Sequence, residues 1–128
     1  MIDIGTLRVN DEVAALADDG LHLGNYRARE NGEAVVHLKA GGGKHCKPER
    51  LYPIVSAEQL VVHDYVRPIS ASGRFRKAGY FHGIEDGEVI LFADEFESDR
   101  PDMAMGLARS YRFAVIAGSL ERGASHAA

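Results

Sequence analysis

The hydrophobic residues of this chain follow short alternating runs, which is the pattern of half-buried β-strands. Segments of about five to ten residues are rich in Val, Ile, Tyr and Phe, and each is bounded by Gly, Asp or Asn. These segments cover residues 11–17, 25–30, 34–40, 64–69, 74–83, 88–94 and 111–118. One stretch differs: residues 101–111 place Asp102 in a first turn and let Met103 and Leu107 face inward, which predicts a short helix. We therefore expect an all-β fold with one inserted helix.

Two dipeptides predict tight hairpin turns between neighbouring strands. Asn31-Gly32 separates the runs at 25–30 and 34–40, and Asp86-Gly87 separates GYFHGIE from EVILFAD. Both dipeptides tolerate the positive φ angles that two-residue hairpin loops require. Each half of the chain is therefore expected to contain a hairpin with the same turn chemistry.

The two halves also share a longer pattern. VNDEV at 9–13 is matched by VHDYV at 62–66, and in each half a Gly lies seven residues after the second Val. The hairpins NGEAVVHL and DGEVILFA match at an offset of 55, Tyr26 aligns with Tyr80 at 54, and LYPIV aligns with YRFAV at 60. We interpret this as an internal duplication, with domains at 1–56 and 57–118. Residues 119–128 lose the apolar alternation and are expected to form a flexible tail.

Composition adds limits on size and location. The chain has 128 residues, of which 45% are hydrophobic and 27% charged, an ordinary globular balance. Each half alone is too small to be comfortably stable, so we expect the two domains to pack together. The single Cys46 excludes an internal disulfide, and no apolar run approaches the roughly 20 residues of a membrane span. The start of the chain has neither a basic region nor an apolar block, so a cytoplasmic protein without membrane contact is expected.

The first half resembles a Tudor-like or SH3-like small β-barrel. The likeness rests on an Asp-x-Val strand, an Asp-Gly loop, a Tyr-Arg-Ala strand, a Gly-turn hairpin, a Gly-rich connection and a helical turn closing on Arg-Leu-x-Pro. It covers about residues 6–55, with a weaker echo over 60–117. The resemblance implies two tandem SH3-like barrels, with the short helix inserted in the second.

Barrels of this family that read methylated Lys or Arg hold the cation in an aromatic cage. The resemblance places the first cage position at Asn25 and, in the second copy, at Gly79, and the chain has no Trp. Neither residue can form a cage wall, so the family's methyl-reading function is not predicted here. SH3-like barrels also include a tetrameric plasmid-borne dihydrofolate reductase, whose Val-Gln-Ile-Tyr signature this chain lacks.

One candidate contact surface combines basic and aromatic side chains. Strand alternation in RFRKAGYFH would place Phe75 and Phe81 in the core and a second set of side chains on the opposite face. That set consists of Arg74, Arg76, Tyr80 and His82, and the corresponding strand of the first half offers Arg27 and Arg29. Guanidinium forks and stacking rings suit phosphates and unstacked bases, although a solvated barrel face is the simpler interpretation.

The other candidate surface is an acidic segment in the second half. It contains the carboxylates of Asp94, Glu95, Glu97, Asp99 and Asp102. Residues 57–128 hold eight Lys or Arg against eleven Asp or Glu, and the whole chain has a net charge of −4. This balance disfavours a broad grip on nucleic acid, whereas a dense carboxylate cluster can bind a basic protein or imitate a nucleic-acid backbone.

No catalytic or metal-binding signature emerges from the sequence. GGGK at 41–44 lacks the upstream Gly and trailing Ser or Thr of a phosphate-binding Walker loop. His45 and Cys46 are adjacent on a predicted strand and would point to opposite faces, so they would not easily share one metal ion with His37 or His22. We expect no metal and no cofactor.

These observations favour a non-catalytic binding or adaptor module that recognises a protein partner through the acidic segment. Such a module would suit a bacterial or mobile-element accessory or inhibitor protein. Two alternatives stay open: a nucleic-acid-binding barrel that uses the Arg and Tyr face, and a small oligomeric barrel enzyme. The sequence leaves the oligomeric state open between a monomer and a small homo-oligomer.

Overall fold

The computed structural model describes residues 2, 4–93 and 105–118, and this part of the chain is all-β. It divides into two compact units, with unit 1 ending at Ile54 and unit 2 beginning at Val55. Unit 1 contains η1 (Ile4–Thr6), β1 (Glu12–Ala17), β2 (Gly20–Glu30), β3 (Glu33–Leu38), β4 (Gly43–Cys46), η2 (Pro48–Arg50) and most of β5 (Leu51–Ser56). Unit 2 contains η3 (Ala57–Gln59), β6 (Tyr65–Ile69), β7 (Gly79–Glu85), β8 (Glu88–Phe92), β9 (Met105–Ala108) and β10 (Arg112–Ala117).

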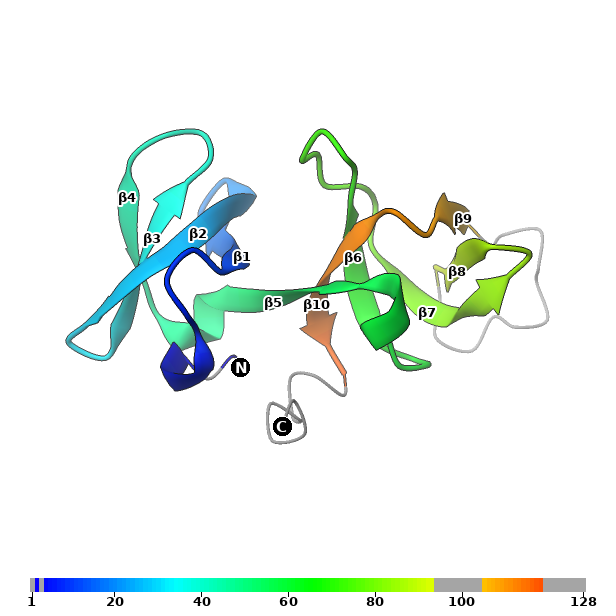
Figure 1. The fold of residues 1–128 in the computed structure, drawn as a ribbon, viewed down its shortest axis with the longest axis horizontal. Helices are drawn as coiled ribbons and strands as arrows, with labels where there is room; N and C mark the ends of the chain where they lie inside the picture. The colour runs from blue at the N-terminus through cyan, green and yellow to red at the C-terminus, as the bar shows by residue number, and fades with distance from the viewer. Residues whose placement is uncertain (1, 3, 94–104, 119–128) are drawn as a thin grey trace. The chain divides into compact units, whose positions relative to one another are not determined.

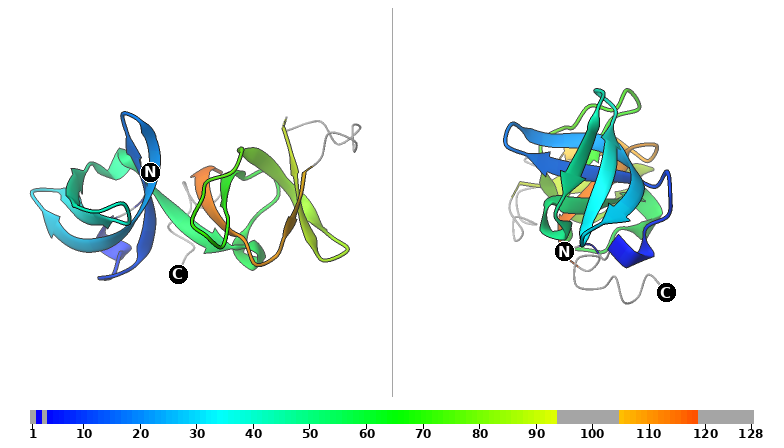
Figure 2. Two further views of the ribbon diagram at one scale, coloured as in Figure 1. Left: turned by 90° about the horizontal axis from the view of Figure 1, so that it is seen from above. Right: turned by 90° about the vertical axis from the view of Figure 1, so that its left-hand side faces the viewer.

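Both units are antiparallel meanders that are completed by a strand from the end of the unit (Figure 1). In unit 1 the hydrogen-bonded order is β4-β3-β2-β1-β5, and in unit 2 it is β9-β8-β7-β6-β10. Two-residue turns join β1 to β2, β2 to β3 and β7 to β8, whereas residues 70–78 connect β6 to β7. The closing strands β5 and β10 return to β1 and β6. The strands of each unit are strongly curved, as the left view in Figure 2 shows. All-β architecture is therefore confirmed for the described residues.

The two predicted hairpin turns are confirmed. Asn31 and Gly32 have φ angles of 52° and 78°, and Asp86 and Gly87 have 52° and 79°. Positive φ at both central residues is the condition for the turn type that matches strand twist. Each hairpin also carries an irregularity at the same place, because the β2–β3 register shifts between Tyr26 and Ala28 and the β7–β8 register between Phe81 and Gly83.

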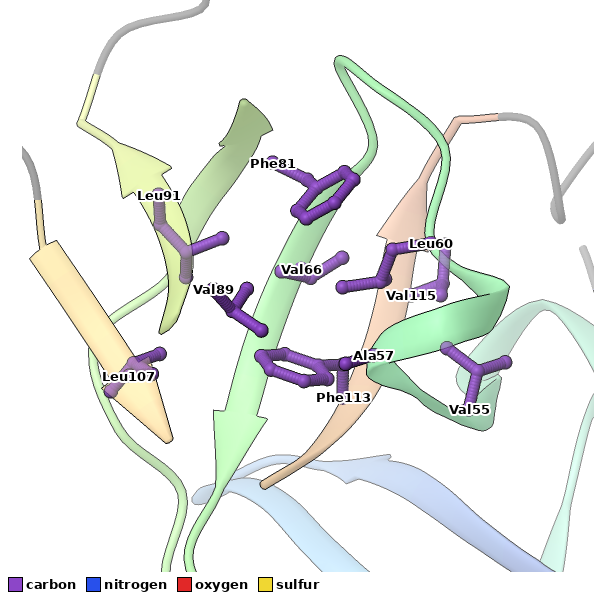
Figure 3. Packing of buried hydrophobic residues seen from close by; sticks show 10 residues of the cluster. All are labelled: Val55, Ala57, Leu60, Val66, Phe81, Val89, Leu91, Leu107, Phe113 and Val115. Atoms are coloured by element: carbon purple, nitrogen blue, oxygen red, sulfur yellow. The ribbon is translucent and has the colours of Figure 1, made fainter. Parts of the chain in front are cut away.

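Each unit has its own hydrophobic core. The core of unit 1 is formed by Ile2, Ile4, Val13, Ala15, Tyr26, Ala34, Val36, Cys46 and Leu51. In unit 2 ten side chains from β5 to β10 point toward one another (Figure 3). Val36 and Val89 are fully buried and Leu91 is 1% exposed, as the hairpin pattern predicted. Alternate residues of each hairpin strand are buried, and a slip of one residue would turn them toward solvent. Their burial therefore fixes the register of both hairpins.

The turn that leads into the first strand is built identically in both units. In unit 1 a carboxylate oxygen of Asp11 accepts a bond from the Arg8 amide at 2.9 Å, and in unit 2 Asp64 accepts from the Val61 amide at 2.9 Å. The residue before each Asp has positive φ, 78° at Asn10 and 77° at His63. The matched motif in the sequence is thus a matched turn in the structure.

The register corrects two positions of the predicted alignment. The amide of Tyr26 donates to the Asp11 carbonyl at 2.8 Å, and the amide of Phe81 donates to the Asp64 carbonyl at 2.9 Å. Tyr26 therefore corresponds to Phe81 at an offset of 55, and its alignment with Tyr80 is wrong. In the closing strands Leu51 lies opposite Ala15 and Phe113 opposite Pro68, which makes the offset there 62 instead of 60.

Two segments of unit 2 differ from the predicted secondary structure. The strand expected from residue 74 begins at Gly79, because residues 74–78 form a connection that folds back on β6. In the segment expected to be a short helix, residues 105–108 form strand β9, with Leu107 in the core and opposite Val89. Pairing with β8 satisfies this backbone, so the helix prediction is wrong for these four residues, and residues 101–104 lie outside the described part of the chain.

Candidate binding surface

Unit 2 carries a row of aromatic side chains on the face of its sheet that is turned away from the core. Since Val66 and Phe81 are core residues, strand alternation places Tyr65 and Tyr80 on the opposite face. These two tyrosines are cross-strand partners, and their ring centroids lie 4.6 Å apart. Phe92 is the partner of Tyr80 on the next strand. The row therefore crosses three strands in succession.

His82 extends this row beyond Phe92. The ring centroids of His82 and Phe92 lie 4.6 Å apart with an interplanar angle of 57°. Phe92 is buried although it does not belong to the core cluster, whereas His82 is exposed and both tyrosines are half-buried. His82 also lies 3.8 Å from a carboxylate oxygen of Glu85. The row thus combines a buried Phe92, two half-buried tyrosines and an exposed imidazole.

A basic cluster lies on the same face of β6. Arg67 is two residues from Tyr65 on this strand, and its Nε donates to the carbonyl of Arg76 at 2.7 Å. The guanidinium carbon of Arg67 lies 5.7 Å from the centroid of the Phe75 ring. Arg76 donates from Nη1 to the hydroxyl of Tyr111 at 3.1 Å. Two guanidinium groups are thereby held beside aromatic rings.

Backbone hydrogen bonds fix the connection that presents this cluster. The Ser70 amide donates to the Arg74 carbonyl at 2.9 Å, and the Arg76 amide donates to the Pro68 carbonyl at 2.8 Å. An isolated bridge joins Ile69 to Phe75. Because these bonds tie the connection to the end of β6, Arg74, Phe75 and Arg76 are placed by the scaffold instead of by a free loop.

The sequence that carries the cluster is locally basic, although Glu85 follows it and lies 3.8 Å from His82 at the end of the aromatic row. Residues 65–84 contain Arg67, Arg74, Arg76 and Lys77 and no Asp or Glu. All four side chains are exposed or half-buried. A run of cations without carboxylates creates a positive potential even on a protein whose net charge is negative.

The sequence identified part of this surface. Tyr80 and His82 share the outer face as predicted, and Arg76 lies at the adjoining cluster, whereas Phe75 is only half-buried and is not in the core. Tyr65, Arg67 and Phe92 were missed. Alternation in DYVRPI would have found the first two, since Val66 and Pro68 occupy the buried positions between them.

The remaining sequence candidates lie elsewhere. Arg27 of unit 1 donates to the side-chain oxygen of Asn10 at 3.0 Å, and Arg29 is exposed on β2. The acidic segment, with Asp94, Glu95, Glu97, Asp99 and Asp102, lies outside the described residues, as does the predicted tail at 119–128.

Metal-binding groups do not converge in the part of the chain that the structure describes, where no group of three His, Cys, Asp or Glu side chains could hold a metal ion. On β4, His45 is exposed and Cys46 is buried, as the alternation predicted. Burial raises the pKa of the Cys46 thiol, which disfavours the nucleophilic thiolate.

Among residues 2, 4–93 and 105–118, no helix has the length and apolar character needed to cross a membrane.

No family model matches this chain, and no curated protein is similar to it in sequence.

Proposed function

We propose that this chain is a non-catalytic binding protein built from two SH3-like barrels, and that unit 2 binds single-stranded nucleic acid. The observation that carries the proposal is the Tyr65–Tyr80 pair beside the Arg67–Arg76 cluster, within a stretch that contains no carboxylate. The strand order of each unit, a four-stranded meander completed by a fifth strand, supports the barrel assignment.

The chemistry of the surface matches the two recurring parts of a single strand. Unpaired bases stack on aromatic rings, and each such contact contributes about 1–3 kcal/mol with little dependence on sequence. Guanidinium groups donate to phosphate oxygens in a planar, two-pronged geometry. Arg76 and Arg67 lie beside Phe75 and Tyr111, so phosphates and bases can be contacted together.

Charge favours a short single strand over a duplex. The net charge of −4 gives no broad positive field for the backbone of a double helix. A local patch of four cations can neutralise only a few phosphates. Stacking must therefore supply much of the affinity, and bases are available for stacking only where they are unpaired.

The protein-partner function predicted from the acidic segment stays a prediction of the sequence. Its carboxylates lie outside the described residues, so no geometry supports it over the surface in unit 2. It makes a distinct prediction: changing Asp94, Glu95, Glu97 and Asp99 to Asn or Gln should slow association with a basic partner, most visibly at low salt.

The test is fluorescence anisotropy with a labelled oligothymidylate of about 12 nucleotides at two salt concentrations, a length within the site sizes of small barrels. We expect Tyr80→Ala to weaken binding by about 5- to 150-fold, the equivalent of one lost stacking contact. The double variant Arg67→Gln/Arg76→Gln should weaken binding and lower the salt slope by roughly 0.7 for each lost phosphate contact. Lys39→Gln, which removes an exposed cation on unit 1, is the matched control.

Two outcomes would contradict the proposal. One is that the unchanged protein does not bind the oligonucleotide in low salt. The other is that all variants, shown to be folded by circular dichroism, bind as tightly as the unchanged protein. Equal losses in Lys39→Gln would mean that general charge, and not this surface, causes the binding.

A further inference from the structure

A surface pocket of about 260 Å³ lies in unit 1, where the end of β1, the start of β3 and strand β4 meet η2. It is lined by Leu16, Asp18, Glu33, Lys44, His45, Cys46, Lys47 and Arg50. Pockets that enclose drug-sized molecules measure roughly 300–1,000 Å³, so this one suits a smaller ligand.

Three permanent cations line this pocket, against two carboxylates. Arg50 is oriented by the chain itself: its Nη1 donates to the Leu16 carbonyl at 3.3 Å and lies 3.9 Å from a carboxylate oxygen of Asp18. Within the described part of the chain, neither Lys44 nor Lys47 has a carboxylate within ion-pair distance. At ion-pair distance both ammonium groups are thus open to an anion that enters the pocket, while Lys44 also acts at longer range on the Asp19 carboxylate.

Lys44 reaches the pocket from the core-facing side of β4. It lies opposite Val36 in the β3–β4 register, and Cys46 lies opposite Ala34. Val36, Ala34 and Cys46 all belong to the core of unit 1, while Lys44 is half-buried. An ammonium in this position is less well hydrated than one on an open face, so an anion beside it gains more from the contact.

The second unit shows that the fold does not need this lysine. The β8–β9 register places Met105 opposite Leu91 and Leu107 opposite Val89, which are the positions of Lys44 and Cys46. Unit 2 therefore fills both positions with apolar side chains that support its core. Because an apolar residue at the position of Lys44 supports the same fold in unit 2, packing alone does not explain the lysine in unit 1. Binding of a ligand explains it better.

We propose that this pocket binds a phosphate group, either as the free ion or as a small monoester. A phosphate dianion can engage the two lysines as point charges and the Arg50 fork through paired hydrogen bonds. A carboxylate carries one charge and gains less from three cations. The site belongs to unit 1 alone and does not depend on the proposed function of unit 2.

The test is a titration with inorganic phosphate followed by ¹H–¹⁵N correlation spectra, against sodium chloride at matched ionic strength. We expect saturable shifts at the amides of Lys44, Lys47 and Arg50 and none at Phe113. Lys44→Gln/Lys47→Gln should weaken binding about tenfold or more, since removing charged partners costs at least one power of ten in affinity. Lys39→Gln is the control, because it removes a cation of the same unit that lies outside the pocket.

Adenosine 5′-monophosphate and adenosine distinguish the two sources of phosphate. Tighter binding of the monophosphate than of inorganic phosphate would indicate a monoester ligand, and equal binding would indicate the free ion. The proposal is overturned if sodium chloride reproduces the shifts, if no saturable shift occurs, or if the double variant binds unchanged. If the double variant is misfolded, the titration is repeated with Lys47→Gln alone, which should fold because the Lys47 side chain is exposed. Unchanged phosphate binding by this single variant would then overturn the proposal.

Discussion

Units 1 and 2 share one backbone plan but present different chemistry on the face turned away from the core. The registers match Tyr65 with Glu12, Tyr80 with Asn25, Phe92 with His37 and His82 with Arg27. The aromatic row of unit 2 is thus replaced in unit 1 by polar and charged side chains. The interior and the turns are preserved, so the outer face is where the two copies have diverged.

The polar residues on the outer face of unit 1 form hydrogen bonds and an ion pair with neighbouring residues of the same unit. Glu12 forms an ion pair with Lys39 at 3.3 Å, and Asn25 donates to the Asn10 carbonyl at 3.0 Å. Arg27 donates to the side chain of Asn10, also at 3.0 Å. Unit 2 instead packs its rings against one another, Tyr65 on Tyr80 and His82 on Phe92. One scaffold can therefore carry a polar outer face or an aromatic one without changing its register.

The largest expected effect tests whether the two closing strands are equivalent. Leu51 is 1% exposed and Phe113 is fully buried, at matched positions of β5 and β10. We expect Phe113→Ala to lower the free energy of unfolding by about 3–5 kcal/mol and Leu51→Ala by about 2–5 kcal/mol. Urea denaturation measured by circular dichroism checks this. Ile84→Ala, at a side chain that is 38% exposed, should cost under about 0.5 kcal/mol; a similar cost for all three would break the comparison.

A smaller effect separates the two turn aspartates. Asp64 is 1% exposed, whereas Asp11 is exposed, although both accept the same backbone hydrogen bond at 2.9 Å. Because burial makes a lost charged acceptor more costly, Asp64→Ala should destabilise by about 1.5–3 kcal/mol and Asp11→Ala by about 0.5–1.5 kcal/mol. The measurement is again urea denaturation, and a larger loss for Asp11→Ala would show that burial does not set the cost of losing this carboxylate.

The last comparison concerns two matched glycines in β2 and β7. A Cβ at Gly24 would lie 2.5 Å from Val36 Cγ1, and one at Gly79 would lie 3.0 Å from Leu91 Cβ. Since Val36 and Leu91 are buried and cannot move freely, Gly24→Ala and Gly79→Ala should each destabilise by about 1–3 kcal/mol.

Gly83→Ala is the matched control, because no atom lies within 4 Å of its added Cβ and unit 1 has Ala28 at that position. It should be neutral or should stabilise the protein by up to about 1 kcal/mol, because alanine lowers the conformational entropy of the unfolded chain. Thermal melts of the three variants check this, and destabilisation by Gly83→Ala equal to that of the others would show that close packing is not the cause.

The sequence predicted features that depend on a few neighbouring residues. The Asn31-Gly32 and Asp86-Gly87 turns were recognisable because few residues other than Gly, Asn and Asp adopt positive φ easily. A strand was expected around His45 and Cys46 without bounds, and β4 lies there. Strand β9 was missed, since it has four residues, includes Gly106, and becomes a strand by pairing with β8. Such pairing is tertiary information and leaves little trace in a short window.

Non-local contacts also explain why the candidate surface was only partly predicted. Residues 74–78 alternate like a strand, but hydrogen bonds to the end of β6 make them a connection and move Arg74 and Arg76 off strand β7. Tyr26 was aligned with Tyr80 by residue identity, whereas its burial and hydrogen bonding match Phe81. Chemical likeness and structural equivalence therefore disagreed by one residue, enough to exchange the two faces of a strand.

The continuity of β5 has a consequence for the order of folding. Its first residues, Leu51 to Pro53, complete unit 1 by pairing with β1, and two residues later Val55 enters the core of unit 2. The meander hairpins can form locally within microseconds, but the pairing of Val13 with Pro53 closes a long loop and must follow later. During synthesis, the sheet of unit 1 is therefore completed only when its own last residues, Leu51 to Pro53, have been made, directly before the first core residue of unit 2.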